Sequence, residues 1–297
     1  MMINSKFEIV GIQDTSIQAA SLESKRKRYR LPNLSLVVLL LLVAACMFYR
    51  LIITKDPTYM DLEHNNIRPN SSFYFGTDTM GRDIFSMIWY GGRVSLFIGI
   101  CSTMLSTLLA ILIGAISGCA NARLDALIMR FTEIFLSIPN LLIILLLQAM
   151  LGKPNVLSIS FVIGFTSWSS IAKVVRTEVK QIRTSEYVIA SKCMGGSFYH
   201  ILKKHLAPNF ASSIMFMVIM NVKSAIVAES TLSFMGIGLP LEIISWGSML
   251  SLSDQALMTK SWWIILIPGF FLTVTLLCLT RFCERFRNDM NQKPNNL

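Results

Sequence analysis

Long apolar stretches separated by shorter polar ones run along most of this 297-residue chain. A helix needs about 20 largely apolar residues to cross a bilayer, so the pattern predicts six transmembrane helices. We expect them at residues 34–53, 94–118, 131–151, 156–173, 210–228 and 262–279. The fourth is the least apolar, because its end contains the polar run 166–170. The pattern therefore predicts an all-α integral membrane protein.

Clusters of lysine and arginine give the expected orientation. Five basic residues lie between positions 25 and 30, and the loop after the fourth span and the carboxyl-terminal tail are also basic. Because basic loops stay on the cytoplasmic side, both termini are expected inside the cell. The predicted organisation is a cytoplasmic tail (1–33), a transmembrane domain (34–280) and a second cytoplasmic tail (281–297). Within the domain, loops 54–93 and 229–261 lie outside, and the loop 174–209 lies inside.

Single residues predict local features of these helices and loops. Thr77 or Asp78 is expected to cap a short helix in the first outer loop. Pro139 is expected to kink the third span. Gly114 and Gly118 form a small-xxx-small pair suited to close helix packing. Glycine and proline interrupt the second outer loop, which is expected to re-enter the membrane in part.

The composition supports a membrane protein and excludes other classes. Hydrophobic residues make up 53% of the chain and charged residues 15%, and the mean hydropathy is +0.57, which is unusual for a soluble domain. The net charge of +10 does not indicate nucleic-acid binding, because the basic residues flank the spans and no motif that reads nucleic acid accompanies them. The six cysteines have neither disulfide-framework nor metal-ligand spacing.

No motif in the sequence carries catalysis. The chain lacks the GxxxxGK[ST] loop that cradles nucleotide phosphates. It also lacks a Ser/His/Asp, Cys/His or paired-carboxylate constellation. We therefore predict no catalytic residue, no metal site and no cofactor held by this chain. Any uphill transport would draw its energy from a partner or from an ion gradient.

Polar and ionisable side chains inside a span are costly in lipid, which makes them candidates for a functional role. Lys223 and Asn221 lie within the fifth predicted span, and Glu229 lies at its outer end. These three residues are the candidates for lining a translocation path. For Lys223 the sequence leaves two interpretations open: it lines a hydrated path, or it snorkels or pairs with another subunit.

The segment 186–208 has the pattern of two short amphipathic helices joined at Gly195 and Gly196. Apolar-face positions recur in the second helix at 198, 201, 202, 205 and 206, which is helical spacing. The pair is too short and too charged to cross a bilayer, yet it has an apolar face to bury. We expect it to dock a soluble partner on the cytoplasmic side.

This segment resembles the cytoplasmic coupling motif EAA-x3-G-x9-I-x-L-P of bacterial ABC importer permeases. Ala190, Gly195 and Pro208 match the motif, whereas Ser191 and His205 replace motif residues. Three further segments resemble the dipeptide/oligopeptide/nickel permeases, and their C-type subunit fits best: FGTDTMGRDIFSMIWYGGRVSL, LDALIMRFTEIFLSIPNLL and AESTLSFMGIGLPLEIISWGSML. The segments occur in the family's order, and the resemblance extends from about residue 34 to residue 287.

The resemblance implies a type I ABC importer permease fold, with six transmembrane helices and a cytoplasmic coupling helix pair. It also implies a bacterial cell membrane, with lipid around the chain, and three kinds of protein partner: a homologous second permease, two cytosolic ATP-binding subunits and an extracellular substrate-binding protein. ATP and magnesium would bind to the ATP-binding subunits. The residues implied in coupling are Glu186, Ala190, Ser191, Gly195, His205 and Pro208. Glu186, about one turn before Ile189, could replace the carboxylate that the motif has at position 189.

The sequence predicts on this basis a non-catalytic permease subunit of an ATP-driven importer, with short peptides as cargo. Nickel or metal–metallophore complexes are the alternative cargo. A more distant alternative is a self-sufficient secondary transporter, in which segment 186–208 is only structural and an ion gradient supplies the energy. A membrane enzyme is disfavoured, because no catalytic constellation is present.

Overall fold

The computed structural model describes residues 34–186, 188–189 and 207–291 of this chain. Contacts divide the chain into Met1–Leu34 and Ser35–Leu297, and nearly all the described residues belong to the second unit. In this described part every regular element is a helix, apart from one isolated bridge between Thr77 and Asp83. The predicted all-α class is therefore confirmed for the residues that the structure describes.

The first predicted span is interrupted. α2 (Leu34–Met47) and α3 (Tyr49–Ile52) are separated at Phe48, whose backbone leaves helical geometry with φ −95° and ψ 28°. α2 is apolar on all sides and buries Leu39, Leu42 and Cys46 against the protein, which is typical of a helix between the bundle and lipid. Its 14 residues are fewer than the roughly 20 that cross a bilayer without help.

α4 (Ile84–Cys119) is a single helix of 36 residues that begins inside the predicted first outer loop. Its N-cap is Asp83, whose carboxylate accepts the Ser86 backbone N–H at 3.0 Å and the Ser86 hydroxyl at 2.6 Å. The prediction of a short helix capped by Thr77 or Asp78 is therefore wrong. Both of these side chains form hydrogen bonds inside the loop, so neither is available to a helix N-terminus.

Two pairs of consecutive helices are bent. α5 (Ala122–Ser137) and α6 (Asn140–Leu151) meet at 89° around Pro139. The predicted kink is confirmed and is a full break, because proline lacks an N–H and disfavours helical geometry in the residue before it. α7 (Val156–Thr166) and α8 (Trp168–Arg183) meet at 43°. Their junction falls in the polar run that weakens the fourth predicted span.

The last helices extend beyond their predicted bounds. α11 (Ala207–Phe234) and α14 (Trp263–Asn291) are both longer than the fifth and sixth predicted spans. Between them the chain forms α12 (Trp246–Leu250) and α13 (Ser253–Met258). Glu229 consequently lies within α11 and not in the loop that follows it.

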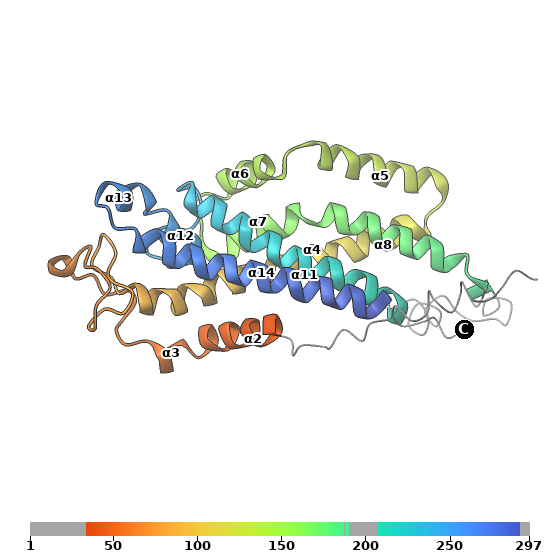
Figure 1. The fold of residues 1–297 in the computed structure, drawn as a ribbon. Helices are drawn as coiled ribbons and strands as arrows, with labels where there is room; N and C mark the ends of the chain where they lie inside the picture. Colours follow the sequence, from red (N-terminus) through yellow and green to blue (C-terminus); the bar gives the residue numbers. More distant parts are fainter. Residues whose placement is uncertain (1–33, 187, 190–206, 292–297) are drawn as a thin grey trace, which may run out of the picture. The chain divides into compact units, whose positions relative to one another are not determined.

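Among the described residues, α4, α11 and α14 contain stretches long and apolar enough to cross a membrane, and counting each bent pair as one span raises the number to five. α4 packs against α7, α8 and α11, and α14 packs against α11 and α12 (Figure 1). The predicted close packing of the glycine pair is confirmed in this bundle. A Cβ atom on Gly114 would lie 2.6 Å from the Ala172 carbonyl oxygen of α8, and one on Gly118 would lie 2.7 Å from Val179 Cβ.

We expect Gly114→Val to separate α4 from α8. A new side chain at a 2.6 Å backbone contact cannot be accommodated by a rotamer change, and such overpacking typically costs about 1–3 kcal/mol. Thermal unfolding of the purified protein in detergent measures the effect. Gly269→Ala in α14 is the matched control, because its nearest contact is an ordinary 3.9 Å. Equal melting temperatures for the two variants would contradict the close packing.

Candidate functional site

The described structure contains the beginning of the predicted coupling segment. Glu186 is exposed, and Val188 is fully buried in an apolar cluster with Ile182 of α8 and Ile214 of α11. Buried Val188 therefore fixes the start of the segment to the helix bundle. Ala190, Ser191, Gly195 and His205 lie outside the described residues. Pro208 lies in the first turn of α11 and not before this helix, at a position that tolerates proline because its N–H would be unpaired there.

A buried carboxylate connects three helices at the end of α8 that leads into this segment. Asp125 of α5 accepts the Ser117 hydroxyl of α4 at 2.6 Å, and it accepts Nη2 of Arg176 on α8 at 2.6 Å. Lys180 of α8 also donates to it. One turn further along α8, Arg183 donates to the Gly118 carbonyl oxygen at 2.9 Å.

Sequence reasoning missed this cluster, because the basic residues of α8 were used only to orient the chain. The spacing of Arg176, Lys180 and Arg183 is i, i+4, i+7, which places all three on one helix face. The loop predicted at 118–130 contains a single acidic residue, Asp125. The sequence therefore did contain a signal for this cluster: a single acidic residue in one segment and a basic helix face in a later one.

The path candidates of α11 separate into two groups. Asn221 donates to the Ser106 hydroxyl of α4 at 2.5 Å, and Glu229 contacts Ser95 of α4. Asn221 and Glu229 are eight positions apart, so they lie on one face of the helix, and that face packs on α4. Lys223 is half-buried and lies away from this face. The structure thus brings Asn221 and Glu229 to a helix interface and leaves Lys223 apart from them.

Glu229 is fully buried and its carboxylate is surrounded by serine hydroxyls. Oε1 accepts Ser245 at 2.7 Å and Ser233 at 3.0 Å, whereas Oε2 accepts Ser95 at 3.2 Å and Ser230 at 3.4 Å. The four serines belong to α4, to α11 and to the residue that precedes α12. A single carboxylate thus connects three separate parts of the chain.

Three of these serines also accept a backbone N–H. Ser95 accepts from Trp246, Ser245 accepts from Ser248, and Ser233 accepts from Leu239, at 3.0 to 3.2 Å. Each hydroxyl has one proton, which it donates to the carboxylate. Buried polar groups are stable only when they are hydrogen-bonded. The carboxylate is therefore the shared acceptor that completes the bonding of all three hydroxyls.

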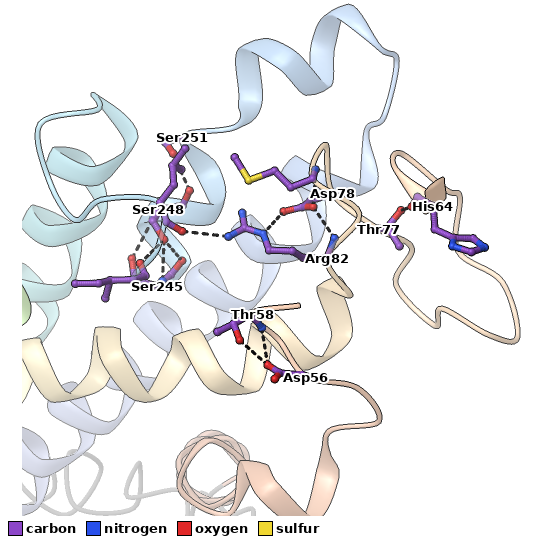
Figure 2. Close-up of polar contacts among 12 residues, drawn as sticks. Asp56, Thr58, His64, Thr77, Asp78, Arg82, Ser245, Ser248 and Ser251 are labelled. Carbon is purple, nitrogen blue, oxygen red and sulfur yellow. Dashed lines mark hydrogen bonds and ion pairs between the residues drawn. The ribbon is translucent and has the colours of Figure 1, made fainter. Parts of the chain in front are cut away.

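The segment GTDTMGRD forms a second buried cluster, in the loop between α3 and α4. Asp78 accepts Nε of Arg82 at 2.7 Å, and both side chains are almost completely buried (Figure 2). Arg82 also donates Nη1 to the Leu241 carbonyl oxygen at 3.1 Å. Thr77 donates to the His64 carbonyl oxygen at 2.6 Å, and its own carbonyl accepts the Trp263 indole N–H at 3.1 Å. The cluster therefore connects the loop between α3 and α4 to the loop between α11 and α12 and to α14.

The segment SWGSML, which ends the third of the permease-like segments, forms the short helix α12 and its N-cap. Ser245 is the N-cap of α12 and forms a capping box with Ser248 (Figure 2). Trp246 is fully buried and donates its indole N–H to the Ile88 carbonyl oxygen of α4 at 3.0 Å. The α12 region is thereby fixed to α4 through both Trp246 and the Glu229 cluster.

Over the described ranges, no group of three or more His, Cys, Asp or Glu side chains could hold a metal ion.

Comparison with known proteins adds independent findings. The family model described as binding-protein-dependent transport system inner membrane component matches residues 110–292. The dipeptide transport system permease protein DppC of Bacillus subtilis is 33% identical over 90% of this chain and 83% of its own length. The oligopeptide transport system permease protein OppC of Haemophilus influenzae is 33% identical over 95% of this chain and 92% of its own length.

The fold is also found among solved structures. A chain from the inward-facing MetNI methionine ABC transporter superposes with a TM-score of 0.56 at 15% identity. The match covers 68% of the present chain and 95% of the other. At this level of identity the likeness concerns the arrangement of helices alone.

Proposed function

This chain belongs to the family of binding-protein-dependent transport system inner membrane components, and from that membership we propose that it is the permease subunit of an ATP-driven importer of short peptides. The observation that carries the proposal is the 33% identity to a dipeptide permease over 90% of the chain. The same level of identity to an oligopeptide permease supports the class of cargo. The chain itself is non-catalytic in this proposal, and ATP and magnesium bind to its partner subunits.

The proposed complex contains a homologous second permease, two cytosolic ATP-binding subunits and an extracellular substrate-binding protein. Segment 186–208 is proposed to dock on an ATP-binding subunit. Val188 and the Asp125 cluster support this role, because they join the start of the segment to α4, α5 and α8. A displacement of the segment by ATP-driven closure would thereby be passed to three helices of the bundle.

We propose six membrane crossings with both termini in the cytoplasm of a bacterial cell. The three long helices and two bent pairs supply five crossings, and α2 together with α3 supplies the sixth. In this topology the Glu229 cluster and the GTDTMGRD cluster lie at the outer side. Lys223, Asn221 and Glu229 remain proposed path residues, with Lys223 the one that stands apart from the α4 contact.

Affinity purification and uptake test the proposed function. The tagged chain should co-purify with an ATP-binding subunit, and the reconstituted complex with its binding protein should accumulate a labelled dipeptide only when ATP is supplied. Uptake driven by an ion gradient, with no ATPase recovered, would instead establish a secondary transporter. ATP-dependent uptake of nickel without peptide uptake would establish the metal cargo.

A substitution at Gly195 tests the role of the coupling segment. Gly195 is the predicted turn between the two short helices, and a β-branched side chain disfavours the backbone geometry of a tight turn. Gly195→Val is therefore expected to lower recovery of the ATP-binding subunit and to lower uptake in parallel. Gly269→Ala is again the control. Normal recovery of the ATPase with Gly195→Val would count against this docking site.

A further inference from the structure

A cavity of about 470 Å³ lies at the outer end of the α2–α3 segment, between α3, the following loop and the start of α4. Four of the side chains that line it carry the argument: Tyr49, Arg50, Asp56 and Tyr90. The cavity therefore contains a cation, an anion and two aromatic rings. None of the residues that line it belongs to the serine cluster of Glu229.

The two charges of the cavity are not paired with each other. Within the described residues, Arg50 makes one hydrogen bond, from Nε to the Tyr49 hydroxyl at 3.4 Å, and its terminal nitrogens are free. Asp56 uses Oδ1 to accept the Thr58 N–H at 2.9 Å and the Thr58 hydroxyl at 2.7 Å (Figure 2). Oδ2 of Asp56 has no hydrogen-bond partner among the described residues. The cavity thus offers a donor fork and a carboxylate oxygen to one ligand.

Both groups are charged at neutral pH. The Thr58 hydroxyl and N–H lower the pKa of Asp56 below its ordinary value, because both bonds favour the carboxylate. Arginine remains protonated throughout the physiological range. A ligand with one negative and one positive group would complement the cavity.

The aromatic wall of the cavity is held in place. The Tyr49 and Tyr90 rings meet edge to face with centroids 5.3 Å apart. The Arg93 guanidinium lies over both rings, 4.6 Å and 4.8 Å from their centroids. Such cation–π contacts stabilise aromatic geometry, and tyrosine is typical of the membrane–water boundary.

An exposed apolar stripe continues from this wall along α4. Phe97, Ile100 and Met104 follow Arg93 at i+4, i+7 and i+11, and their exposed fractions are 45%, 50% and 68%. Helical spacing places all of them on the side of α4 that contains Arg93. On α2 and its junction with α3, Met47 and Phe48 are exposed as well. The cavity therefore lies where surface suited to lipid tails meets a polar loop.

From this arrangement we propose that the cavity binds an aminophospholipid of the outer leaflet, of the phosphatidylethanolamine type. The Arg50 fork accepts the phosphate, which suits the planar donor geometry of arginine. Oδ2 of Asp56 accepts the ligand ammonium, and the acyl chains lie on the stripe that begins at Phe97. The proposal depends on the proposed membrane topology and is independent of the cargo and of ATPase coupling.

The headgroup chemistry separates this ligand from other lipids. Phosphatidylglycerol has the phosphate and lacks an ammonium, so it leaves Asp56 unpaired beside an anion. Phosphatidylcholine has a quaternary ammonium, which cannot donate a hydrogen bond to Oδ2. Of the three, phosphatidylethanolamine alone satisfies both free groups of the cavity.

Native mass spectrometry of the intact transporter in detergent tests the proposal. The probes are phosphatidylethanolamine, phosphatidylglycerol and phosphatidylcholine with identical acyl chains. The wild-type protein should retain phosphatidylethanolamine most strongly. Loss of a charge-assisted hydrogen bond corresponds to roughly tenfold weaker binding, so Arg50→Leu should reduce retention of all three lipids by about that factor. Asp56→Asn should weaken retention of phosphatidylethanolamine without weakening that of phosphatidylglycerol, so the preference between these two lipids is lost.

Arg123→Leu, which removes an exposed arginine of α5, is the matched control and should retain the wild-type preference. Arg50 and Asp56 are exposed, so all variants should melt at the wild-type temperature in lipid-free detergent. Equal retention of the three lipids by the wild type would overturn the proposal, as would an unchanged preference in Asp56→Asn. Displacement of the lipid by a dipeptide in an Arg50-dependent manner would assign the cavity to peptide and would also overturn it.

Discussion

Replacing Glu229 with leucine should be among the most destabilising single changes in this chain. The leucine side chain removes the acceptor that Ser95, Ser233 and Ser245 share. Each buried hydroxyl left without its partner costs about 1–3 kcal/mol, so the sum is on the order of 3 kcal/mol or more. We expect a large fall in melting temperature, and loss of transport, since the polar link that joins α4, α11 and the start of α12 is lost.

Glu229→Gln tests whether the acceptor or merely the volume of the side chain matters. Glutamine can keep its oxygen toward the shorter bonds of Ser245 and Ser233, but its amide then presents N–H groups to Ser95. The variant should lose roughly half as much stability as Glu229→Leu, because about half of the acceptor sites remain. Adding Ser95→Ala to Glu229→Gln should lower the stability further, because the Trp246 backbone N–H then loses its acceptor.

Ser224→Ala is the control for both variants. Ser224 is an exposed serine of α11 that donates to the Met220 carbonyl of its own helix, and its removal should change the melting temperature little. If Glu229→Leu melted like Ser224→Ala, the serine cluster would contribute nothing to stability. If Glu229→Gln were as unstable as Glu229→Leu, losing one carboxylate oxygen would cost as much stability as losing both.

Features encoded by neighbouring residues could be predicted from the sequence. Pro139 breaks the third span because its ring acts on the residues next to it, and the Gly114–Gly118 pair allows close packing because its spacing is one helix turn. The long apolar stretches likewise predicted an all-α membrane protein, because each stretch is a run of neighbouring residues. These effects act within a few positions, so composition and spacing contain the required information.

Features that depend on distant partners could not be predicted in this way. Glu229 was recognised as a costly residue in a span, but the serines around it come from positions as far apart as 95 and 245. Thr77 and Asp78 have ordinary N-cap chemistry, yet bonds to His64 and Arg82 occupy them, and Asp83 caps α4. Several residues near a helix start compete for the cap, and tertiary bonding decides which one serves.

The buried ion pair between Asp78 and Arg82 provides the other large expected effect. Arg82→Met should leave Asp78 as a buried carboxylate without its cation, and breaking such a pair from one side typically costs about 3–5 kcal/mol. The Leu241 carbonyl also loses its donor. The loop between α3 and α4 should then separate from the loop between α11 and α12. Limited proteolysis of residues 54–83 should become faster at the same time as the melting temperature falls.

A double variant distinguishes the pair from its individual charges. Asp78→Asn combined with Arg82→Met removes the buried anion as well, so it should be more stable than Arg82→Met alone, although the bonds to Met80 and Arg82 backbone N–H groups are weakened. Arg68→Met, at an exposed position of the same loop, should leave proteolysis unchanged. A double variant less stable than Arg82→Met would mean that Asp78 acts mainly through the loop backbone. The carboxylate would then stabilise the turn at Gly81, where φ is +75°, and the arginine would be secondary to that turn.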